Sequence, residues 1–547
     1  MGTTPAGQDV AAPHFTRPAN ALCSTWVSPE PTKKWNITDM PTDSQIGLSL
    51  VPELMRAHAH SQPNKVALYE GEHAITFAAL DAQMDRAAAA LQAAGLSAKD
   101  TIALCGLNSV AYVVMFFGAL RAGVTAALIA PSATSQAVAA MSKDSGAKLL
   151  FADTGLMADI APHLDGTMPL LPLGGDEYDA WLAAAPSTPA PVQIDPTWAF
   201  NIIYSSGTTG APKGIVQSHK MRSDHIQRVG VAFGYGPDAI TMIATPLYSN
   251  TTLVSFIPAI ALGGTVVLAG KFDARAYIKL AARHKATHAM LVPVQYKRIM
   301  AVPDFDQFDL SSFQAKFCTS APFAAELKTD ILARWPGGLV EFYGMTEGGG
   351  TCILVAHQHP DKLGTVGQPV DGHDIRLIDD EGHEVATGKT GEIVGHSSAM
   401  MEGYHGQATK TREAEWYDET GKRFIRTGDI GCFDEDGFLT LMDRKKDMII
   451  SGGFNIYPSD LEAELIQHAA IADVAVVGVP SEDWGETPVG FIVPKAGAKA
   501  DADEIKSWLA ARVGKTQRLS DVVFTDELPR SAIGKVLKRE LREGYVR

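Results

Sequence analysis

Cysteine is scarce in this chain, with five residues among 547. They are Cys23, Cys105, Cys318, Cys352 and Cys432, and no two of them form a Cys-x-x-Cys pair. This spacing argues against a cysteine-ligated metal site and against a disulfide framework. We therefore expect buried thiols and a reducing compartment.

Positive charge and long apolar runs are also lacking. The formal net charge is −15, which argues against a surface that binds nucleic acid or anionic membranes. Residues 1–49 lack the basic and then apolar segments of a signal peptide. The most apolar run, residues 110–131, is interrupted by Gly118, Arg121 and Gly123, so it predicts a core helix and a strand rather than a membrane span. We expect a cytoplasmic protein without a transmembrane segment.

Apolar residues are abundant instead, at 46% of the chain, and they recur in an alternating rhythm of helix and strand. Thr76 is placed to cap a helix that Gly95 stops. Further helices are expected at 112–122, 135–144 and 274–285, and strands at 101–105, 124–129, 148–152, 241–245, 265–268, 289–292 and 317–320. This alternation indicates an α/β fold with mainly parallel sheets and helices on both faces.

Changes of texture along the chain predict its domains. Residues 1–49 are rich in Pro, Thr and Ser and are expected to form an N-terminal arm. Residues 50–443 are expected to form a large domain of repeated α/β subdomains, with a small β-rich unit after residue 371. Residues 444–547 are expected to form a smaller, mobile α+β domain.

One Gly-rich stretch has the composition of a polyphosphate-binding loop. Residues 204–214 read Tyr-Ser-Ser-Gly-Thr-Thr-Gly-Ala-Pro-Lys-Gly and follow an apolar, strand-like segment. Glycines let backbone N–H groups approach an anion, hydroxyls add donors, and the lysine adds a mobile positive charge. It is not a Walker A loop, in which the lysine precedes Ser or Thr. The candidate phosphate-binding residues are Ser205, Ser206, Gly207, Thr208, Thr209, Gly210 and Lys213.

This stretch resembles the phosphate-binding signature of the acyl-adenylate-forming superfamily, which includes acyl-CoA synthetases, peptide-synthetase adenylation domains and luciferases. A second motif, Tyr343-Gly344-Met345-Thr346-Glu347, is similar to that family's second core motif. The resemblance places Tyr343 against adenine with Gly344 beside it, Thr346 near the α-phosphate, and Glu347 on Mg²⁺, a cation that prefers oxygen ligands. It also places Ser320, Ala321 and Pro322 along the other side of adenine.

Further motifs extend the resemblance over residues 50–547. Asp429, in Arg-Thr-Gly-Asp, is expected to accept hydrogen bonds from the ribose hydroxyls. Arg444 falls where the family has an arginine that contacts ribose or phosphate. Lys446 matches the family's hinge position between the two domains.

Two motifs of the C-terminal domain complete the resemblance. Gly452, Gly453 and Phe454 look like the segment that lines the pantetheine tunnel of acyl-CoA synthetases. Adjacent glycines would let a thin, extended ligand pass close to the backbone. Lys535, in Pro-x4-Gly-Lys, resembles the lysine that these enzymes swing onto the carboxylate and the α-phosphate during adenylation.

The resemblance implies an AMP-forming acyl-CoA synthetase, an acid–thiol ligase that uses ATP, Mg²⁺ and coenzyme A. A carboxylate attacks the α-phosphate of ATP, and the CoA thiol then displaces AMP. The expected catalytic residues are Lys535, Lys213, Thr346 and Glu347, because the reaction depends on positioning and charge neutralisation. One arrangement cannot both hold Lys535 in place and admit CoA, which implies a rotation about Lys446.

The acid itself is defined only by its expected pocket. The pocket is expected to include Tyr248, Ser249, Val294 and the three glycines Gly348, Gly349 and Gly350. Many family members carry histidine where this chain has Ser249, and the glycines remove side-chain bulk from the expected pocket floor. Both features favour an acid with a sizeable apolar tail or ring: a medium- or long-chain fatty acid, or an aryl or cyclic acid.

Other interpretations stay open. A stand-alone adenylating enzyme would pass the acyl group to a carrier protein, although the chain has no carrier serine motif and no aspartate in the pocket segment to hold an α-amino group. A fatty-acyl-AMP ligase would stop at the adenylate, although Gly452 and Gly453 favour CoA. His357 and His359 have no third metal ligand at a suitable spacing, and Ser218-His219 lacks the partners of a hydrolase. Besides the small-molecule acid, ATP and CoA, the partners left open are a second copy of the chain and a lysine acetyltransferase acting on Lys535.

Overall fold

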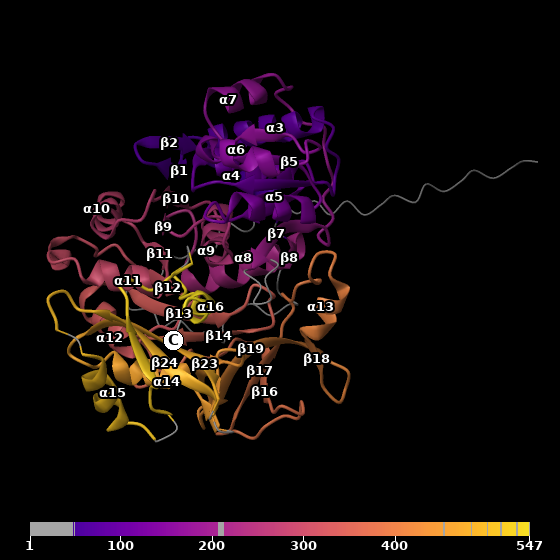
Figure 1. The fold of residues 1–547 in the computed structure, drawn as a ribbon. Coiled ribbons are helices and arrows are strands. Elements are labelled where there is room, and N and C mark those ends of the chain that lie inside the picture. Colours follow the sequence, from indigo (N-terminus) through magenta and orange to yellow (C-terminus); the bar gives the residue numbers. More distant parts are fainter. Residues whose placement is uncertain are drawn as a thin grey trace, which may run out of the picture.

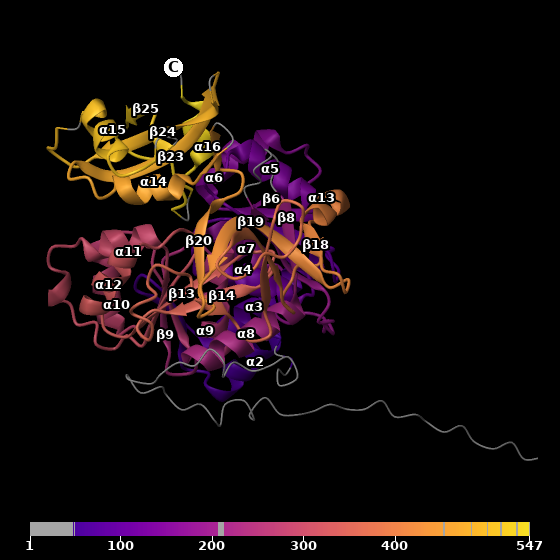
Figure 2. The same ribbon diagram turned by 90° about the horizontal axis from the view of Figure 1, so that it is seen from below.

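The computed structural model describes residue 48 and residues 50–205, 213–451, 454–482, 484–499, 501–514, 517–531 and 534–545. Figure 1 and Figure 2 show the chain as two sheet-and-helix subdomains, a β-rich unit in orange, and a separate C-terminal part in yellow. The predicted α/β class, with a large first domain and a smaller C-terminal domain, is confirmed.

The first subdomain is built on a six-stranded sheet with the order β6-β5-β3-β4-β7-β8. The strands are β3 (Thr101–Cys105), β4 (Thr125–Ile129), β5 (Ala147–Ala152), β6 (Leu170–Pro172), β7 (Ala199–Ser205) and β8 (Lys213–Ser218). Neighbouring strands are parallel except β7 and β8. The helices of this region are α3 (Phe77–Ala93), α4 (Val110–Arg121), α5 (Ser135–Asp144), α6 (Thr154–Ile160), the 3-10 helix η3 (Ala161–His163) and α7 (Asp176–Ala183).

The second subdomain is built on a nine-stranded sheet with the order β15-β14-β13-β12-β11-β9-β10-β1-β2. The strands are β1 (Val66–Glu70), β2 (His73–Thr76), β9 (Ile240–Ile243), β10 (Thr265–Leu268), β11 (His288–Leu291), β12 (Ala315–Cys318), β13 (Gly338–Gly344), β14 (Thr351–Val355) and β15 (Gln368–Pro369). Its centre, from β1 to β13, is parallel, and its edges are antiparallel. The helices are α2 (Val51–Ser61), α8 (His219–Phe233), α9 (Asn250–Ala261), α10 (Ala274–His284), α11 (Pro293–Met300), the 3-10 helix η4 (Phe305–Gln307) and α12 (Ala325–Arg334).

Both subdomains share one hydrophobic core. Phe117 of α4 and Phe256 of α9 are fully buried, and their ring centroids lie 5.7 Å apart. Burying a phenylalanine side chain stabilises a fold by about 1.5–3 kcal/mol, so this shared core ties the two sheets into one body. In folds with open parallel sheets, ligands usually bind at the carboxyl ends of the strands.

Hydroxyl and carboxylate side chains cap the N-termini of several helices. Thr76 accepts a hydrogen bond from the backbone N–H of Ala79, as the sequence predicts for this cap. Ser109, Thr134, Ser218 and Asp273 cap α4, α5, α8 and α10 in the same way. Each such cap is worth about 1 kcal/mol, because it satisfies a backbone donor that the helix itself cannot.

The β-rich unit has the strand order β16-β17-β19-β18, with β20 paired to β19. Its elements are β16 (Asp374–Ile378), β17 (Thr390–His396), α13 (Ala408–Glu413), β18 (Glu415–Tyr417), β19 (Arg423–Phe433) and β20 (Leu439–Arg444). Arg444 pairs with Asp429 as the last residue of β20. The turn at residues 445–447 then leads into the C-terminal part.

The C-terminal part has its own sheet and its own core. The order is β22-β21-β24-β23, with β25 paired to β24. The elements are β21 (Ile449–Ser451), β22 (Phe454–Ile456), α14 (Pro458–Leu465), β23 (Ile471–Ser481), β24 (Gly485–Pro494), α15 (Ala502–Ala510), β25 (Asp521–Phe524) and α16 (Lys538–Glu543). Its buried residues cluster among themselves, for example Leu461, Val476 and Ile492. A separate core is what a domain needs to move as a unit.

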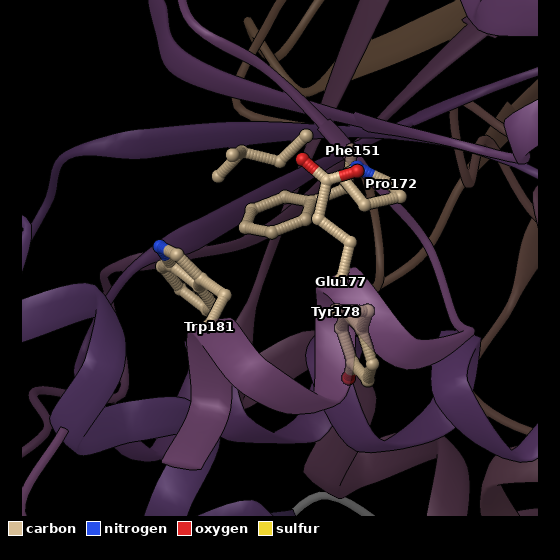
Figure 3. Close-up of a pocket in the computed structure, with 6 residues that line it drawn as sticks. Phe151, Pro172, Glu177, Tyr178 and Trp181 are labelled. Atoms are coloured by element: carbon tan, nitrogen blue, oxygen red, sulfur yellow. The ribbon is translucent and has the colours of Figure 1, made fainter. Parts of the chain in front are cut away.

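A small cavity of about 60 Å³ lies at the edge of the first sheet, between β5, β6 and α7. Figure 3 shows three of its lining residues, Glu177, Tyr178 and Trp181, rising from the one helix. Because β6 and β8 are opposite edges of the sheet, this cavity is remote from Lys213. No helix among the described residues is long and apolar enough to cross a membrane.

Candidate active site

The phosphate-loop stretch joins two antiparallel strands. Ser205 ends β7 and Lys213 begins β8, and the two residues face each other across the ladder. Ser206, Gly207, Thr208, Thr209 and Gly210 lie outside the described residues. The two ends of the loop therefore lie side by side, and Lys213 is the residue at which the chain rejoins the sheet.

Lys213 and Glu347 meet through a tyrosine that the sequence analysis did not single out. The ammonium of Lys213 lies 4.7 Å from the ring centroid of Tyr404. The hydroxyl of Tyr404 donates a 2.9 Å hydrogen bond to Oε1 of Glu347. The structure thus brings together one residue from each of the first two motifs.

Tyr343 and Arg444 meet at Asp429. The hydroxyl of Tyr343 donates to Oδ2 of Asp429 at 3.0 Å, and Nε of Arg444 lies 3.2 Å from the other carboxylate oxygen. Burial, followed by the charge of Asp429, raises the pKa of Tyr343 well above its usual value. Tyr343, Asp429 and Arg444, which come from three motifs, therefore form one cluster.

Lys535 lies within electrostatic range of this cluster. Its side chain is half-buried, and burial followed by the positive charge of Arg444 lowers its pKa to about 8. Asp429 and Asp447 act in the opposite direction, and the expected hinge residue Lys446 adds a further positive charge. Burial also lowers the pKa of Lys446. The C-terminal lysine is thus docked against the large domain.

The docked segment is a tight hairpin. The N–H of Ser531 donates to the carbonyl of Lys535 at 2.8 Å, and the N–H of Gly534 donates to the carbonyl of Ser531 at 2.8 Å. Gly534 has a φ of 78°, which favours glycine. A Cβ at Gly534 would lie 2.5 Å from Cγ1 of Val294, in the segment predicted to line the acyl pocket.

A second contact between the domains lies beside this hairpin. Nζ of Lys297, on α11, donates to the carbonyl of Ala472 at 3.0 Å. Arg530, in the hairpin, pairs with Asp473 at 2.6 Å. The lysine loop is therefore held both to its own domain and across the domain boundary.

Ser320 adopts a strained backbone. We expected a strand over residues 317–320, but β12 ends at Cys318. Ser320 has a φ of 84°, and its hydroxyl lies 2.5 Å from that of Thr251. Strain of this kind persists only where the surroundings hold it, and it is frequent at functional sites. Ala321 and Pro322 continue the loop toward α12.

Two of the expected acyl-pocket residues lie at the start of α9. Tyr248 is partly buried and packs on the main core, and Ser249 is the buried N-cap position of the helix. Burial raises the pKa of Tyr248. Phe342, which the sequence analysis did not name, is also a partly buried ring on that core, stacked on Phe317 with ring centroids 5.6 Å apart.

The reason given for the three glycines needs a correction. A Cβ at Gly348 would lie 1.9 Å from the carbonyl oxygen of Ala399, and one at Gly349 would lie 2.8 Å from Cβ of Ile425. Gly350 has a φ of 104° and faces Ile375. The missing side chains therefore allow close packing on the β-rich unit. They do not open space at a pocket floor, which is contrary to the expectation from the sequence.

The CoA-tunnel motif is described only in part. Gly452 and Gly453 lie outside the described residues. The backbone of Phe454 begins β22, which pairs with β21. Lys446 lies in the turn that connects β20 to β21.

A buried polar network also supports the site. Arg222 is 1% exposed and donates to Oδ1 of Asn201 at 3.2 Å, to Oδ1 of Asn250 at 3.0 Å, and to Gln217. Gln217 in turn donates to the carbonyl of Thr346 at 2.9 Å. Desolvation lowers the pKa of Arg222 to about 9. No local sequence signal points to this network, because its partners are far apart in the chain.

The described residues contain no cluster of three or more His, Cys, Asp or Glu that could hold a metal ion. His357 lies in the turn after β14, and His359 directly follows it. Glu347 has one carboxylate oxygen held by Tyr404. A carboxylate of this kind fits Mg²⁺, which is commonly held by one carboxylate together with nucleotide phosphates.

Comparison with known proteins agrees with this geometry. Residues 55–405 match the sequence model of the AMP-binding enzyme family, and residues 460–535 match that of the AMP-binding enzyme C-terminal domain. The chain is 33% identical over 494 residues to a feruloyl-CoA synthase from Amycolatopsis, covering 89% of this chain and 97% of that protein. An indoleacetate–CoA ligase from Aromatoleum aromaticum is 31% identical over 511 residues, covering 90% and 97%.

Two further proteins extend the comparison. A fatty acid–[acyl-carrier-protein] ligase from Streptomyces coeruleorubidus is 30% identical over 506 residues, covering 89% of this chain and 95% of that protein. The fold is similar to that of ATP-bound MatB from Rhodopseudomonas palustris, with a TM-score of 0.82, 28% identity, and coverage of 90% of this chain and 99% of that one. The chain therefore belongs to the AMP-binding, adenylate-forming enzyme family, and it is an AMP-forming acid–CoA ligase.

Proposed function

We propose that this ligase activates an aryl carboxylic acid, of the kind named for its ferulate and indoleacetate relatives. The observation that carries the adenylation step of the proposal is the docking of Lys535 beside two further cations, Arg444 and Lys446, and two carboxylates, Asp429 and Asp447. A half-buried site with excess positive charge is suited to an anionic ligand such as a polyphosphate.

The chemistry has two steps. An oxygen of the substrate carboxylate forms a bond to the α-phosphorus of ATP, the bond from that phosphorus to the bridging oxygen breaks, and pyrophosphate leaves. The sulfur of CoA then forms a bond to the acyl carbon, the bond from that carbon to the phosphate oxygen breaks, AMP leaves, and the thiol proton is released. Adenylation thus replaces an oxyanion by a good leaving group.

We assign to the residues the roles that the family resemblance implies. Lys213 and Lys535 offset the charge that develops on the phosphates, and Thr346 contacts the α-phosphate. Glu347 would hold the Mg²⁺ that accompanies ATP, and Gln217 fixes the backbone of Thr346. Preorganised charges of this kind are usually the largest contribution to catalysis.

Nucleotide binding is assigned to the cluster around Asp429. Tyr343 and Gly344 take one face of adenine, and the loop of Ser320, Ala321 and Pro322 takes the other. Asp429 accepts hydrogen bonds from the ribose hydroxyls. Arg444 contacts ribose or phosphate, and the ion pair between Arg444 and Asp429 keeps both side chains in place before ATP arrives.

The second step needs a different arrangement of the C-terminal domain. Docking Lys535 as a charged group costs free energy, as its lowered pKa indicates. ATP phosphates supply the missing countercharge, and their loss as pyrophosphate removes it. We propose that the domain then rotates about Lys446, within residues 445–447, and brings Gly452, Gly453 and Phe454 to the CoA path.

An aryl substrate is supported by two aromatic rings that pack on the shared core of the large domain. Tyr248 and Phe342 are partly buried on the same core, and Val294 lies beneath the lysine hairpin. Aromatic side chains accommodate a planar ring by stacked or edge contacts. We propose that these three side chains, together with Ser249 and the backbone of Gly348, Gly349 and Gly350, surround the acid.

A carrier protein is the second candidate acceptor, favoured by the likeness to the fatty acid–[acyl-carrier-protein] ligase. The test supplies ferulate, 4-coumarate, indoleacetate and fatty acids of several lengths with MgATP, and measures pyrophosphate. CoA or a carrier protein is then added, and the thioester is identified by mass spectrometry. We expect aryl acids with CoA to give the fastest reaction. Faster turnover of fatty acids, or thioester on the carrier alone, would overturn the proposal.

A further inference from the structure

Tyr404 occupies a position that the reaction described above does not yet use. It is 8% exposed, its ring faces the ammonium of Lys213, and its hydroxyl donates to Glu347. The hydroxyl is thus the donor and the carboxylate of Glu347 the acceptor in this contact.

Backbone contacts fix the segment around this tyrosine. The N–H of Met401 donates to the carbonyl of Glu347 at 2.8 Å, and the N–H of His405 donates to the carbonyl of Gly214 at 2.7 Å. Tyr404 itself forms a β-bridge with Ile215 of β8. Residues 401–405 thus join the exit of the phosphate loop to the loop that carries Glu347.

We propose that Tyr404 is a positioning residue for the first half-reaction. Its hydroxyl holds one oxygen of Glu347 and leaves the other available to bind the Mg²⁺ of MgATP, and its ring keeps Lys213 apart from that carboxylate. This inference rests on the proposed function, because it assigns Glu347 and Lys213 to MgATP.

Physical chemistry gives the reason for this arrangement. Without Tyr404 between them, Lys213 and Glu347 would form an ion pair. Neither side chain could then bind MgATP until that ion pair broke. A tyrosine between them satisfies both: the ring attracts the cation, and the hydroxyl satisfies the anion with a charge-assisted hydrogen bond. The site is then preorganised for MgATP.

Two substitutions at Tyr404 separate these contributions. Tyr404→Phe retains the ring and removes the hydroxyl, so we expect the Mg²⁺ concentration for half-maximal ATP–pyrophosphate exchange to rise about tenfold. Tyr404→Leu removes the ring as well, so we expect it also to weaken ATP binding. Thioester formation from supplied acyl-adenylate is expected to change little in either variant.

Direct binding provides a readout that does not depend on turnover. Mn²⁺ is titrated into each protein with a non-cleavable α,β-methylene analogue of ATP, and free Mn²⁺ is measured by electron paramagnetic resonance. Tyr404→Phe should raise the Mn²⁺ dissociation constant by about the same factor. Tyr417→Phe is the matched control, because Tyr417 is exposed and also donates a hydrogen bond to a carboxylate, at 3.0 Å to Glu415. It should leave both measurements unchanged.

The outcomes are distinguishable. Wild-type protein that shows neither exchange nor nucleotide-dependent Mn²⁺ binding would overturn the proposed function itself. Active wild type with unchanged Mg²⁺ and Mn²⁺ behaviour in Tyr404→Phe would overturn only the role of Tyr404. If Tyr404→Phe does not fold, Thr411→Val provides the test instead. Oγ1 of Thr411 accepts a 3.0 Å hydrogen bond from the N–H of Tyr404 and so helps to hold the tyrosine in position. We expect it to weaken Mn²⁺ binding in the same direction, and an unchanged dissociation constant would contradict the inference.

Discussion

Gly534 and Val294 belong to different domains, and they are in contact: a Cβ built on Gly534 would lie 2.5 Å from Cγ1 of Val294. The adjacent residue is Lys535, and Val294 belongs to the expected acyl pocket. The contact thus sets the depth at which the lysine loop docks. It also explains the glycine that precedes the lysine, since its φ of 78° and the close approach both exclude a side chain.

Gly534→Ala is expected to block adenylation selectively. The added methyl group would meet Val294, and alanine at this φ adds about 1 kcal/mol of strain. ATP–pyrophosphate exchange should fall by at least about tenfold, while thioester formation from supplied acyl-adenylate should stay within about twofold. The double variant Gly534→Ala/Val294→Ala should recover part of the exchange. Equal loss of both half-reactions would show that the glycine serves folding instead.

Lys535→Met is expected to stabilise the ligand-free protein while abolishing adenylation. The lysine pKa falls from 10.5 to about 8 in the folded state, so the unfolded chain binds more protons between these pH values, and stability rises with pH across that window. Below pH 8 the buried charge lowers the free energy of unfolding by its full amount, up to about 3 kcal/mol. The melting temperature of the variant should exceed that of the wild type at pH 7 and approach it above pH 10.5.

Lys538→Met is the matched control for that measurement. Lys538 lies 2.8 Å from Glu462, and the pairing raises the pKa of the lysine despite its burial. Its contribution to stability is present below its unfolded pKa and is lost as the pH rises through the folded one. Lys538→Met should therefore lower the melting temperature at pH 7. A common shift in both variants would refute the assignment of the Lys535 effect to its buried charge.

Acetylation of Lys535 is expected to depend on the docked arrangement. An acetyltransferase needs an accessible amine, and Lys535 is half-buried against the large domain. Acetylation with acetyl-CoA should therefore slow when α,β-methylene-ATP and the acid hold the domains in place. The acetylated protein should lose adenylation, because the charge is removed. Mass spectrometry of the peptide containing Lys535, with both half-reaction assays, provides the measurement. Full acetylation with undiminished adenylation would contradict the role given to this lysine.

A bulky residue at position 453 is expected to affect only the second half-reaction. Gly453→Leu would obstruct the path assigned to CoA and leave ATP–pyrophosphate exchange largely intact. Stopped-flow thioester formation from supplied acyl-adenylate gives the direct comparison with exchange. A parallel fall in the two rates would mean that the glycine is needed for the fold of the C-terminal domain.

Local patterns in the sequence identified most of the fold and several members of the site. The cap at Thr76, the buried strands of both sheets and the C-terminal α+β unit follow from hydrophobic periodicity and capping residues. Tyr343, Asp429, Arg444 and Lys535 are predicted site residues because each lies in a short, ordered motif. The structure then brings these four together.

The remaining parts of the site could not be predicted because they depend on contacts between distant segments. Tyr404 is 57 positions from Glu347, and Gln217 is 129 positions from Thr346. A lone tyrosine in a loop gives no local signal. The three glycines at 348–350 are a misleading local signal, because a missing side chain can indicate either open space or close packing. In the structure, the nearby Ala399 and Ile425 show that it indicates close packing.

Single-turnover analysis of the two half-reactions tests the central claim most directly. The protein is mixed with ferulate and MgATP, quenched and analysed by mass spectrometry, and CoA is added to a parallel sample. We predict feruloyl-AMP and pyrophosphate in equal amounts before CoA is added, followed by feruloyl-CoA and AMP in equal amounts afterwards. Adenylate that persists unchanged in the presence of CoA, or no adenylate from any aryl acid, would contradict this account.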